Sequence, residues 1–186
     1  MRTYPCSFEK TWAAAISSLS GKSFVLDSVS KDSGIITFSF VSPDPGEYLD
    51  CGRLDYSGNN GKTGREPESI AGTAPCSELI ITDEMLRPVR ARRTTRLEGK
   101  VNIVFSEAGK HTTKVQVVSR YDMTVKTQSL SVKTPYQSSA SVIFTTGQEG
   151  VHDAGGALRC VSLYSLERDV LDAIEQQLAG VAAGRN

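Results

Sequence analysis

Hydrophobic residues recur at helical spacing near both ends of the chain, and at every second position in several segments between them. The first helical stripe, within about residues 7–20, consists of Phe8, Trp12, Ala15, Ile16 and Leu19. The second, within about residues 162–182, consists of Leu163, Leu166, Val170, Leu171, Ile174, Leu178 and Val181. Residues three, four and seven positions apart share one side of a helix, so the pattern predicts an amphipathic helix at each end.

The middle of the chain alternates between apolar and polar residues, which is typical of strands that bury one face. Such strands are predicted over about residues 23–29 and 35–41, in a hairpin that includes residues 101–105 and 115–121, and around residues 140–144. The side chains expected to face the core include Ile36, Phe38, Phe40, Val101, Ile103, Phe105, Val115, Val117, Val142 and Phe144. Consecutive strands without helical crossovers require antiparallel pairing.

This order of elements predicts an α+β fold, in which a curved antiparallel β-sheet packs against a long C-terminal helix and an N-terminal helix. With 186 residues, of which 39% are hydrophobic, the chain has the usual size of one domain. We therefore expect residues 1–186 to form a single domain.

Residues from about 57 to 95 lack a regular hydrophobic period and contain clustered glycines and two prolines. Only residues 79–81 offer a weak strand signal there. We expect a long loop insertion at about 57–95, which in a compact domain is unusual enough to indicate either a functional insertion or a short hidden element.

The charge balance argues against a nucleic-acid partner, because 21 basic and 21 acidic residues give a net charge of zero. One local patch departs from this balance and consists of Arg87, Arg90, Arg92, Arg93 and Arg96. Five guanidinium groups within ten residues are suited to bind phosphate, acidic lipid headgroups or an acidic protein surface. The alternative is a solvated loop neutralised by the nearby acidic residues.

No pattern predicts catalysis, a cofactor or a metal ion. Gly61-Lys62-Thr63 matches the end of a phosphate-binding loop, but Tyr56 stands where that motif requires its first glycine. His111 and His152 have no second histidine or cysteine at metal-ligand spacing. We therefore expect a noncatalytic protein without cofactor or metal.

Four cysteines are present, and none forms a C-x-x-C pair. Cys51 lies at a strand end and Cys160 just before the last helix, so a sheet that grips this helix would bring them together. They are candidates for a disulfide, with two separate buried thiols as the alternative. The sequence leaves the redox state and pairing of Cys6 and Cys76 open.

Short segments resemble BamC-like domains of bacterial cell-envelope lipoproteins. Residues 8–15, Phe-Glu-Lys-Thr-Trp-Ala-Ala-Ala, are similar to the helix start of that family, and residues 31–36, Lys-Asp-Ser-Gly-Ile-Ile, to the beginning of one of its strands. Residues 48–52, together with Cys160, Leu166 and Glu167, resemble the paired cysteine segments of envelope lipoproteins with the same element order. The resemblance implies a helix-grip-like fold.

The resemblance further implies a noncatalytic accessory domain on the periplasmic side of an outer membrane, acting through contacts with an envelope protein. Membrane attachment would come only from a lipid anchor upstream of this chain, and a cytoplasmic location stays open. The alternative function is binding of a small apolar ligand or lipid, in a cavity between sheet and C-terminal helix lined by Ile36, Phe38 and Phe40. The sequence does not determine the oligomeric state.

Overall fold

The computed structural model describes residues 1–20, 24–56, 68–82, 88–131, 135–152 and 158–183. The chain divides into two compact units. Unit 1 comprises Met1–Phe40, Gly99–Arg120 and Tyr164–Asn186, and unit 2 comprises Val41–Glu98 and Tyr121–Leu163. Each unit is therefore built from segments that lie far apart in the sequence.

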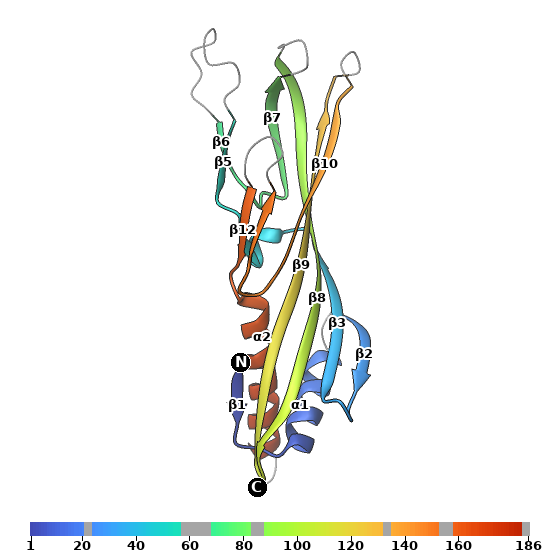
Figure 1. Cartoon of the computed structure of the whole chain (residues 1–186), viewed down its shortest axis with the longest axis vertical. Coiled ribbons are helices and arrows are strands. Elements are labelled where there is room, and N and C mark those ends of the chain that lie inside the picture. The colour runs from blue at the N-terminus through green and yellow to red at the C-terminus, as the bar shows by residue number, and fades with distance from the viewer. Residues whose placement is uncertain (21–23, 57–67, 83–87, 132–134, 153–157, 184–186) are drawn as a thin grey trace. The chain divides into compact units, whose positions relative to one another are not determined.

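Two helices, one short 3-10 helix and a series of strands make up the described part of the chain (Figure 1). In chain order they are β1 (Arg2–Tyr4), α1 (Phe8–Ser20), β2 (Val25–Ser30), β3 (Ile35–Ser42), η1 (Pro45–Glu47), β4 (Leu49–Asp50), β5 (Arg53–Tyr56), β6 (Glu68–Ala71), β7 (Cys76–Thr82), β8 (Pro88–Gly109), β9 (Thr112–Ser129), β10 (Gln137–Thr145), β11 (Glu149–His152), β12 (Leu158–Ser162) and α2 (Ser165–Ala183).

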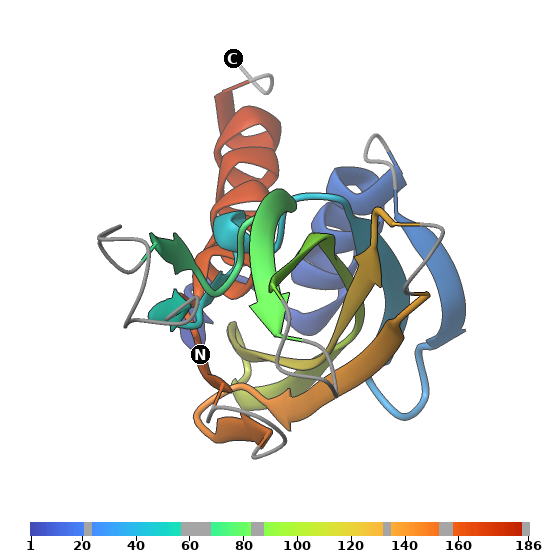
Figure 2. The same ribbon diagram turned by 90° about the horizontal axis from the view of Figure 1, so that it is seen from above.

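Unit 1 contains a sheet with the strand order β1-β9-β8-β3-β2, to which β8 and β9 contribute the halves next to their shared hairpin turn. β1 pairs antiparallel with β9, and β2 pairs antiparallel with β3. β2 is the edge strand, and in the view of Figure 2 it lies at the outer margin of the ribbon. The sheet therefore ends in a strand that has one described neighbour.

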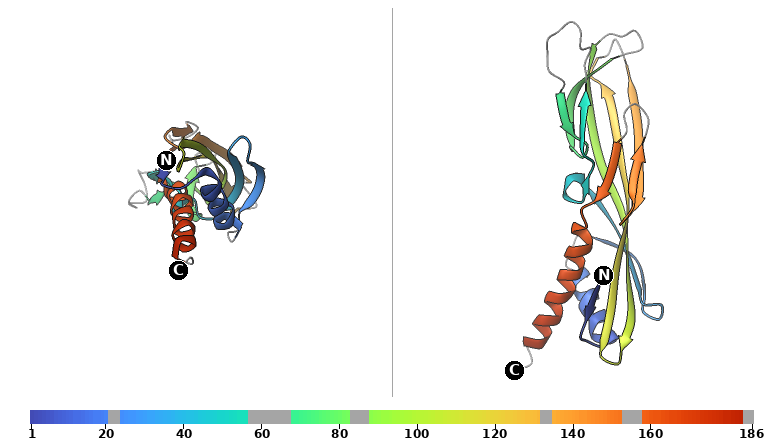
Figure 3. Two further views of the ribbon diagram at one scale, coloured as in Figure 1. Left: turned by 90° about the horizontal axis from the view of Figure 1, so that it is seen from below. Right: turned by 60° about the vertical axis from the view of Figure 1, so that its left-hand side comes forward.

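The helices of unit 1 bury most of the described residues of the apolar stripes that the sequence predicts. Trp12 of α1 packs its ring edge-on against Phe105 of β8, with 5.1 Å between the ring centroids. α2 packs against α1, and Figure 3 shows the two helices side by side. The buried stripe residues are Trp12, Ala15, Leu19, Leu166, Val170, Leu171 and Ile174. The end of β1 is tied to α2 as well, because the Tyr4 hydroxyl donates to the Leu171 carbonyl oxygen at 2.8 Å.

A glycine is required in the turn between β2 and β3. Gly34 has a φ of +64°, in the left-handed region that costs other residues energy. Its carbonyl oxygen accepts a hydrogen bond from the Phe105 amide at 2.8 Å. A Cβ at this position would lie 2.6 Å from the Phe105 carbonyl oxygen, so the close approach of the two backbones leaves no room for a side chain.

The regular elements described in unit 2 are strands and the short 3-10 helix η1. β7 and β10 pair with the remaining halves of β8 and β9, and β7 runs antiparallel to β8. A second sheet has the order β11-β12-β4, and β5 pairs with β6. The buried apolar side chains of unit 2 include Leu49, Leu79, Val89, Ala91, Leu97, Tyr121, Met123, Val142, Phe144 and Leu158.

The α+β class, the largely antiparallel pairing and the presence of a helix near each end agree with the sequence-based prediction. The predicted loop at 57–95 is wrong for the residues that the structure describes there, since β6, β7 and the first part of β8 occupy them. Residues 57–67 and 83–87 lie outside the described part. The predicted start of the last helix is also too early, because Ser162 ends β12 and Leu163 is 43% exposed.

Candidate functional site

A disulfide in unit 2 joins β12 of the three-stranded sheet to the residue that follows β4. Val161 lies opposite Asp50 in the antiparallel register of β12 and β4, and the same register places Cys160 opposite Cys51, just beyond β4. The sulfur atoms of Cys51 and Cys160 are bonded, and both residues are buried. The predicted Cys51–Cys160 pair is thus confirmed, whereas Cys6 and the exposed Cys76 are free thiols.

The disulfide is enclosed by close backbone packing. The Gly72 amide donates to the Gly52 carbonyl oxygen at 2.8 Å, and a Cβ on Gly72 would overlap the backbone and side chain of Cys51. The Arg93 guanidinium donates to the Gly72 carbonyl oxygen at 2.7 Å, and Met123 Sδ lies 3.9 Å from Cys51 Sγ. These contacts make the bond an internal support of unit 2.

The structure does not bring the predicted arginine patch together on one surface. These arginines lie on β8, where successive side chains point to opposite faces. Arg90, Arg92 and Arg96 are exposed, whereas Arg93 points inward and is only 1% exposed. Arg87 lies outside the described residues.

The exposed arginines of β8 are paired with carboxylates. Glu78, which lies opposite Arg92 on β7, accepts from Arg90 at 2.8 Å and from Arg92 at 3.4 Å, and Arg96 pairs with Glu98 at 3.2 Å. Exposed pairs of this kind contribute little to stability. They do reduce the positive charge that the sequence pattern implied for this segment.

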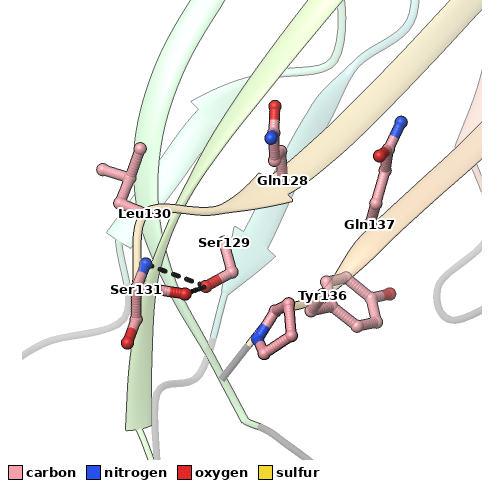
Figure 4. Close-up of a pocket in the computed structure, with 7 residues that line it drawn as sticks. Gln128, Ser129, Leu130, Ser131, Tyr136 and Gln137 are labelled. Carbon is pink, nitrogen blue, oxygen red and sulfur yellow. Dashed lines mark hydrogen bonds between the residues drawn. The ribbon is translucent and has the colours of Figure 1, made fainter. Parts of the chain in front are cut away.

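A shallow recess of about 510 Å³ lies where β9 ends and β10 begins (Figure 4). Its lining consists of Gln128, Ser129, Leu130, Ser131, Pro135, Tyr136 and Gln137. The recess is shaped by backbone pairing, since the Ser129 amide donates to the Tyr136 carbonyl oxygen at 2.8 Å. Its described lining residues present amide groups and an aromatic ring, and none of them is charged. No sequence motif indicated it, because its residues become neighbours only when the two strands pair.

The residues expected to line an apolar cavity are packed in the core of unit 1. Ile36 and Phe38 are completely buried and Phe40 is 6% exposed. The Phe38 ring stacks on Phe24 with 4.5 Å between centroids, and the Phe40 ring fills the space above Gly99. Phe38 and Phe40 are therefore packed against other groups of the core.

The edge strand of the unit 1 sheet, β2, carries exposed apolar side chains. All six residues of β2 are exposed, and its apolar side chains Val25, Leu26 and Val29 are 66%, 45% and 48% exposed. The sequence predicted the strand but not its position at the edge, which depends on the strand order of the folded sheet.

The candidate histidines lie apart from any cluster that the structure describes. His111 is exposed in the turn between β8 and β9, and His152 ends β11. Among the described residues, no group of three or more His, Cys, Asp or Glu side chains is arranged to hold a metal ion. The segment Gly61-Lys62-Thr63 is outside that part of the chain.

The titration shifts in unit 1 belong to the contact between β1 and α2. Burial raises the pKa of Tyr4 to about 12. Arg2 lies 2.7 Å from Asp172 and 2.6 Å from Glu175, and its hydrogen bond to Asp172 raises the pKa of the guanidinium group further. Both pKa shifts arise from contacts in unit 1, and Arg2 and Tyr4 are distant in sequence from the residues that line the recess of unit 2.

None of the described helices is both long and apolar enough to cross a membrane. No protein-family model, curated protein or solved structure shows significant similarity to this chain.

Proposed function

We propose that this protein is a noncatalytic domain of the bacterial cell envelope that acts through protein–protein contacts in an oxidising compartment. The buried Cys51–Cys160 disulfide is the observation that supports an oxidising compartment. Structural disulfides form and persist where the surroundings are oxidising, such as the periplasm, and are rare in the cytosol of most organisms.

The exposed edge of unit 1 supports the part of the proposal that concerns protein contacts. Val25, Leu26 and Val29 leave apolar surface in water on a strand whose outer backbone groups have no described partner. Edges of this kind are usually blunted or covered in soluble proteins. Within this proposal, unit 1 is helix-grip-like, and a lipid anchor upstream of the chain would hold the domain at a membrane.

Thiol trapping in cells tests the compartment. Cells that produce the protein are quenched with acid, free thiols are blocked, disulfides are reduced, and the released thiols are labelled with a maleimide that adds mass. Wild type should gain two labels that the Cys51→Ala/Cys160→Ala variant lacks. A wild-type protein whose four cysteines are all blocked in the first step would contradict export.

Photo-crosslinking in the same cells tests the contact role. A benzophenone amino acid replaces Leu26 of unit 1, and in separate variants Ile143 or Val151, which are exposed apolar positions of unit 2. A protein adduct from at least one position is expected. Absence of adducts from all three would contradict a role in protein contact.

A further inference from the structure

Unit 2 is assembled from two separate segments of the chain, Val41–Glu98 and Tyr121–Leu163. Two pairings of described strands join these segments, one between β8 and β9 and one between β4 and β12. The second is very short, because it consists of Asp50 opposite Val161 and Leu49 opposite Ser162. We call the junction of β4 and β12 the short seam.

The two sides of the short seam are attached to different strands of the larger sheet. On the β4 side, Gly72 packs so closely against Cys51 that no side chain fits between them. Arg93 of β8 donates to the Gly72 carbonyl oxygen at 2.7 Å, which holds this side to β8. On the β12 side, the Ser162 hydroxyl donates to the Tyr121 hydroxyl of β9 at 3.3 Å. Each side therefore has an attachment that does not pass through the seam.

The Cys51–Cys160 disulfide is the covalent link across the short seam. Noncovalent contacts across it include the two residue pairs, the burial of Leu49, and a hydrogen bond from the Leu163 amide to the Tyr48 carbonyl oxygen at 2.9 Å. Each backbone hydrogen bond adds little net stability, because an open seam would exchange it for a bond to water. A crosslink between residues 109 positions apart restricts the open state far more.

Burial controls how the disulfide is reduced. Cys160 is completely buried and Cys51 is 4% exposed, so a reductant reaches a sulfur atom only after the short ladder frays. A thiolate of a dithiol reductant then attacks one sulfur, the bond between the two cysteines breaks, and a mixed disulfide forms. The second thiol of the reductant displaces it. The dithiol ends as a disulfide, and its two electrons and two protons end on the thiols of Cys51 and Cys160.

We propose that the Cys51–Cys160 disulfide is a redox latch, whose reduction by a dithiol opens the short seam of unit 2 while unit 1 and the pairing of β8 with β9 stay folded. Opening uncovers buried side chains beside the disulfide, namely Leu49 and Met123, whose sulfur lies 3.9 Å from Cys51 Sγ. The oxidised protein keeps the seam closed. The inference rests on the proposed function only for the oxidising compartment that would hold the latch shut in cells.

Alkylation of the full chain tests the proposal. Cys6 and Cys76 are first blocked with iodoacetamide in the oxidised protein, and Cys6→Ser/Cys76→Ser gives the same test without blocking. After reduction with dithiothreitol, Cys51 and Cys160 should react with fresh iodoacetamide as readily as in protein unfolded by urea. The fluorescence of Trp12, which follows unit 1, should stay as in the oxidised protein.

Hydrogen exchange measured by mass spectrometry locates the opening. In the reduced protein, the Leu163 amide, which donates across the short seam, should exchange roughly 30-fold faster or more, the factor that corresponds to losing a disulfide. The amides of α1 and β3 should keep the protection that they have in the oxidised protein. The oxidised sample is the matched control, because it has the same sequence.

Two results would overturn the latch. Reduced thiols that stay protected from iodoacetamide would show that the short seam remains closed without the disulfide. Simultaneous loss of Trp12 fluorescence and of protection in α1 and β3 would show that reduction unfolds the whole protein rather than the seam. Thiol trapping in cells is independent of both results, since cysteines found reduced in cells, with a latch that opens as described in purified protein, would refute the oxidising compartment alone.

Discussion

Replacing Gly34 by alanine should destabilise the protein strongly. The left-handed backbone at φ +64° costs alanine about 1–2 kcal/mol. The new Cβ would lie 2.6 Å from the Phe105 carbonyl oxygen, and relieving such overlap costs about 1–3 kcal/mol. Alanine also restricts the unfolded chain, which returns about 0.4–1 kcal/mol. The net loss in free energy of unfolding is therefore about 1–5 kcal/mol.

Gly52→Ala is the matched control for the backbone term. Gly52 has nearly the same φ, +62°, but no atom lies within 4 Å of the position that an added Cβ would take. This variant should lose only about 1 kcal/mol, the left-handed cost less the gain from the unfolded state. The difference between the two variants, about 1–3 kcal/mol, isolates the contact with Phe105.

Urea unfolding measures both variants. The fluorescence of Trp12, the single tryptophan, follows unit 1, and far-ultraviolet circular dichroism follows both units. Gly34→Ala should shift the unfolding midpoint without changing the slope. If Gly34→Ala loses no more stability than Gly52→Ala, the close approach of the β2–β3 turn to β8 is not present in solution.

Three further results are expected. Gly72→Ala, which places a Cβ against Cys51, should lower the melting temperature, whereas Gly180→Ala, at an open helix position, should leave it equal or higher; equal melting temperatures would refute the packing at the disulfide. Loss of the disulfide in Cys51→Ala/Cys160→Ala should cost about 2–5 kcal/mol by thermal unfolding, and an unchanged melting temperature would contradict its structural role. The raised pKa of Tyr4, about 12, stabilises the fold below pH 10, and this contribution is lost as the pH rises from 10 through 12; Tyr4→Phe should flatten that decline in a pH series of unfolding curves, and an unchanged decline would refute the assignment.

The elements with a strong hydrophobic period could be predicted from the sequence. Trp12, Leu166 and Ile174 are buried as their helical spacing indicated, and Ile36 and Phe38 as their alternation indicated. These patterns report directly on which side of an element meets the core. They do not report on strand order, and this is why the edge position of β2 was not predicted.

The segment 57–95 shows where local patterns fail. β7 carries the sequence Cys-Ser-Glu-Leu-Ile-Ile-Thr, in which only the centre is apolar, and the facing part of β8 is rich in arginine. Their strand conformation is supported by pairing across the register, with Glu78 opposite Arg92 and Leu79 opposite Ala91. A charged residue on an exposed strand face is therefore easily mistaken for part of a loop, because its partner is distant in the sequence.

The arginines of β8 and the apolar residues of β2 both show that proximity in sequence does not determine which face of a strand a side chain occupies. Strict alternation puts Arg93 on the opposite face from Arg90, Arg92 and Arg96, so five neighbouring charges in sequence do not make one patch in space. In β2 the alternation is interrupted at Asp27, so Leu26 and Val29 share a face that strict alternation would have assigned to different sides. A one-residue change of register reverses the direction of every following side chain. Deletion of Asp27, the extra residue of the bulge, should restore regular pairing and leave Leu26 and Val29 two positions apart, so that both still lie on the face opposite Phe38 and Ile36.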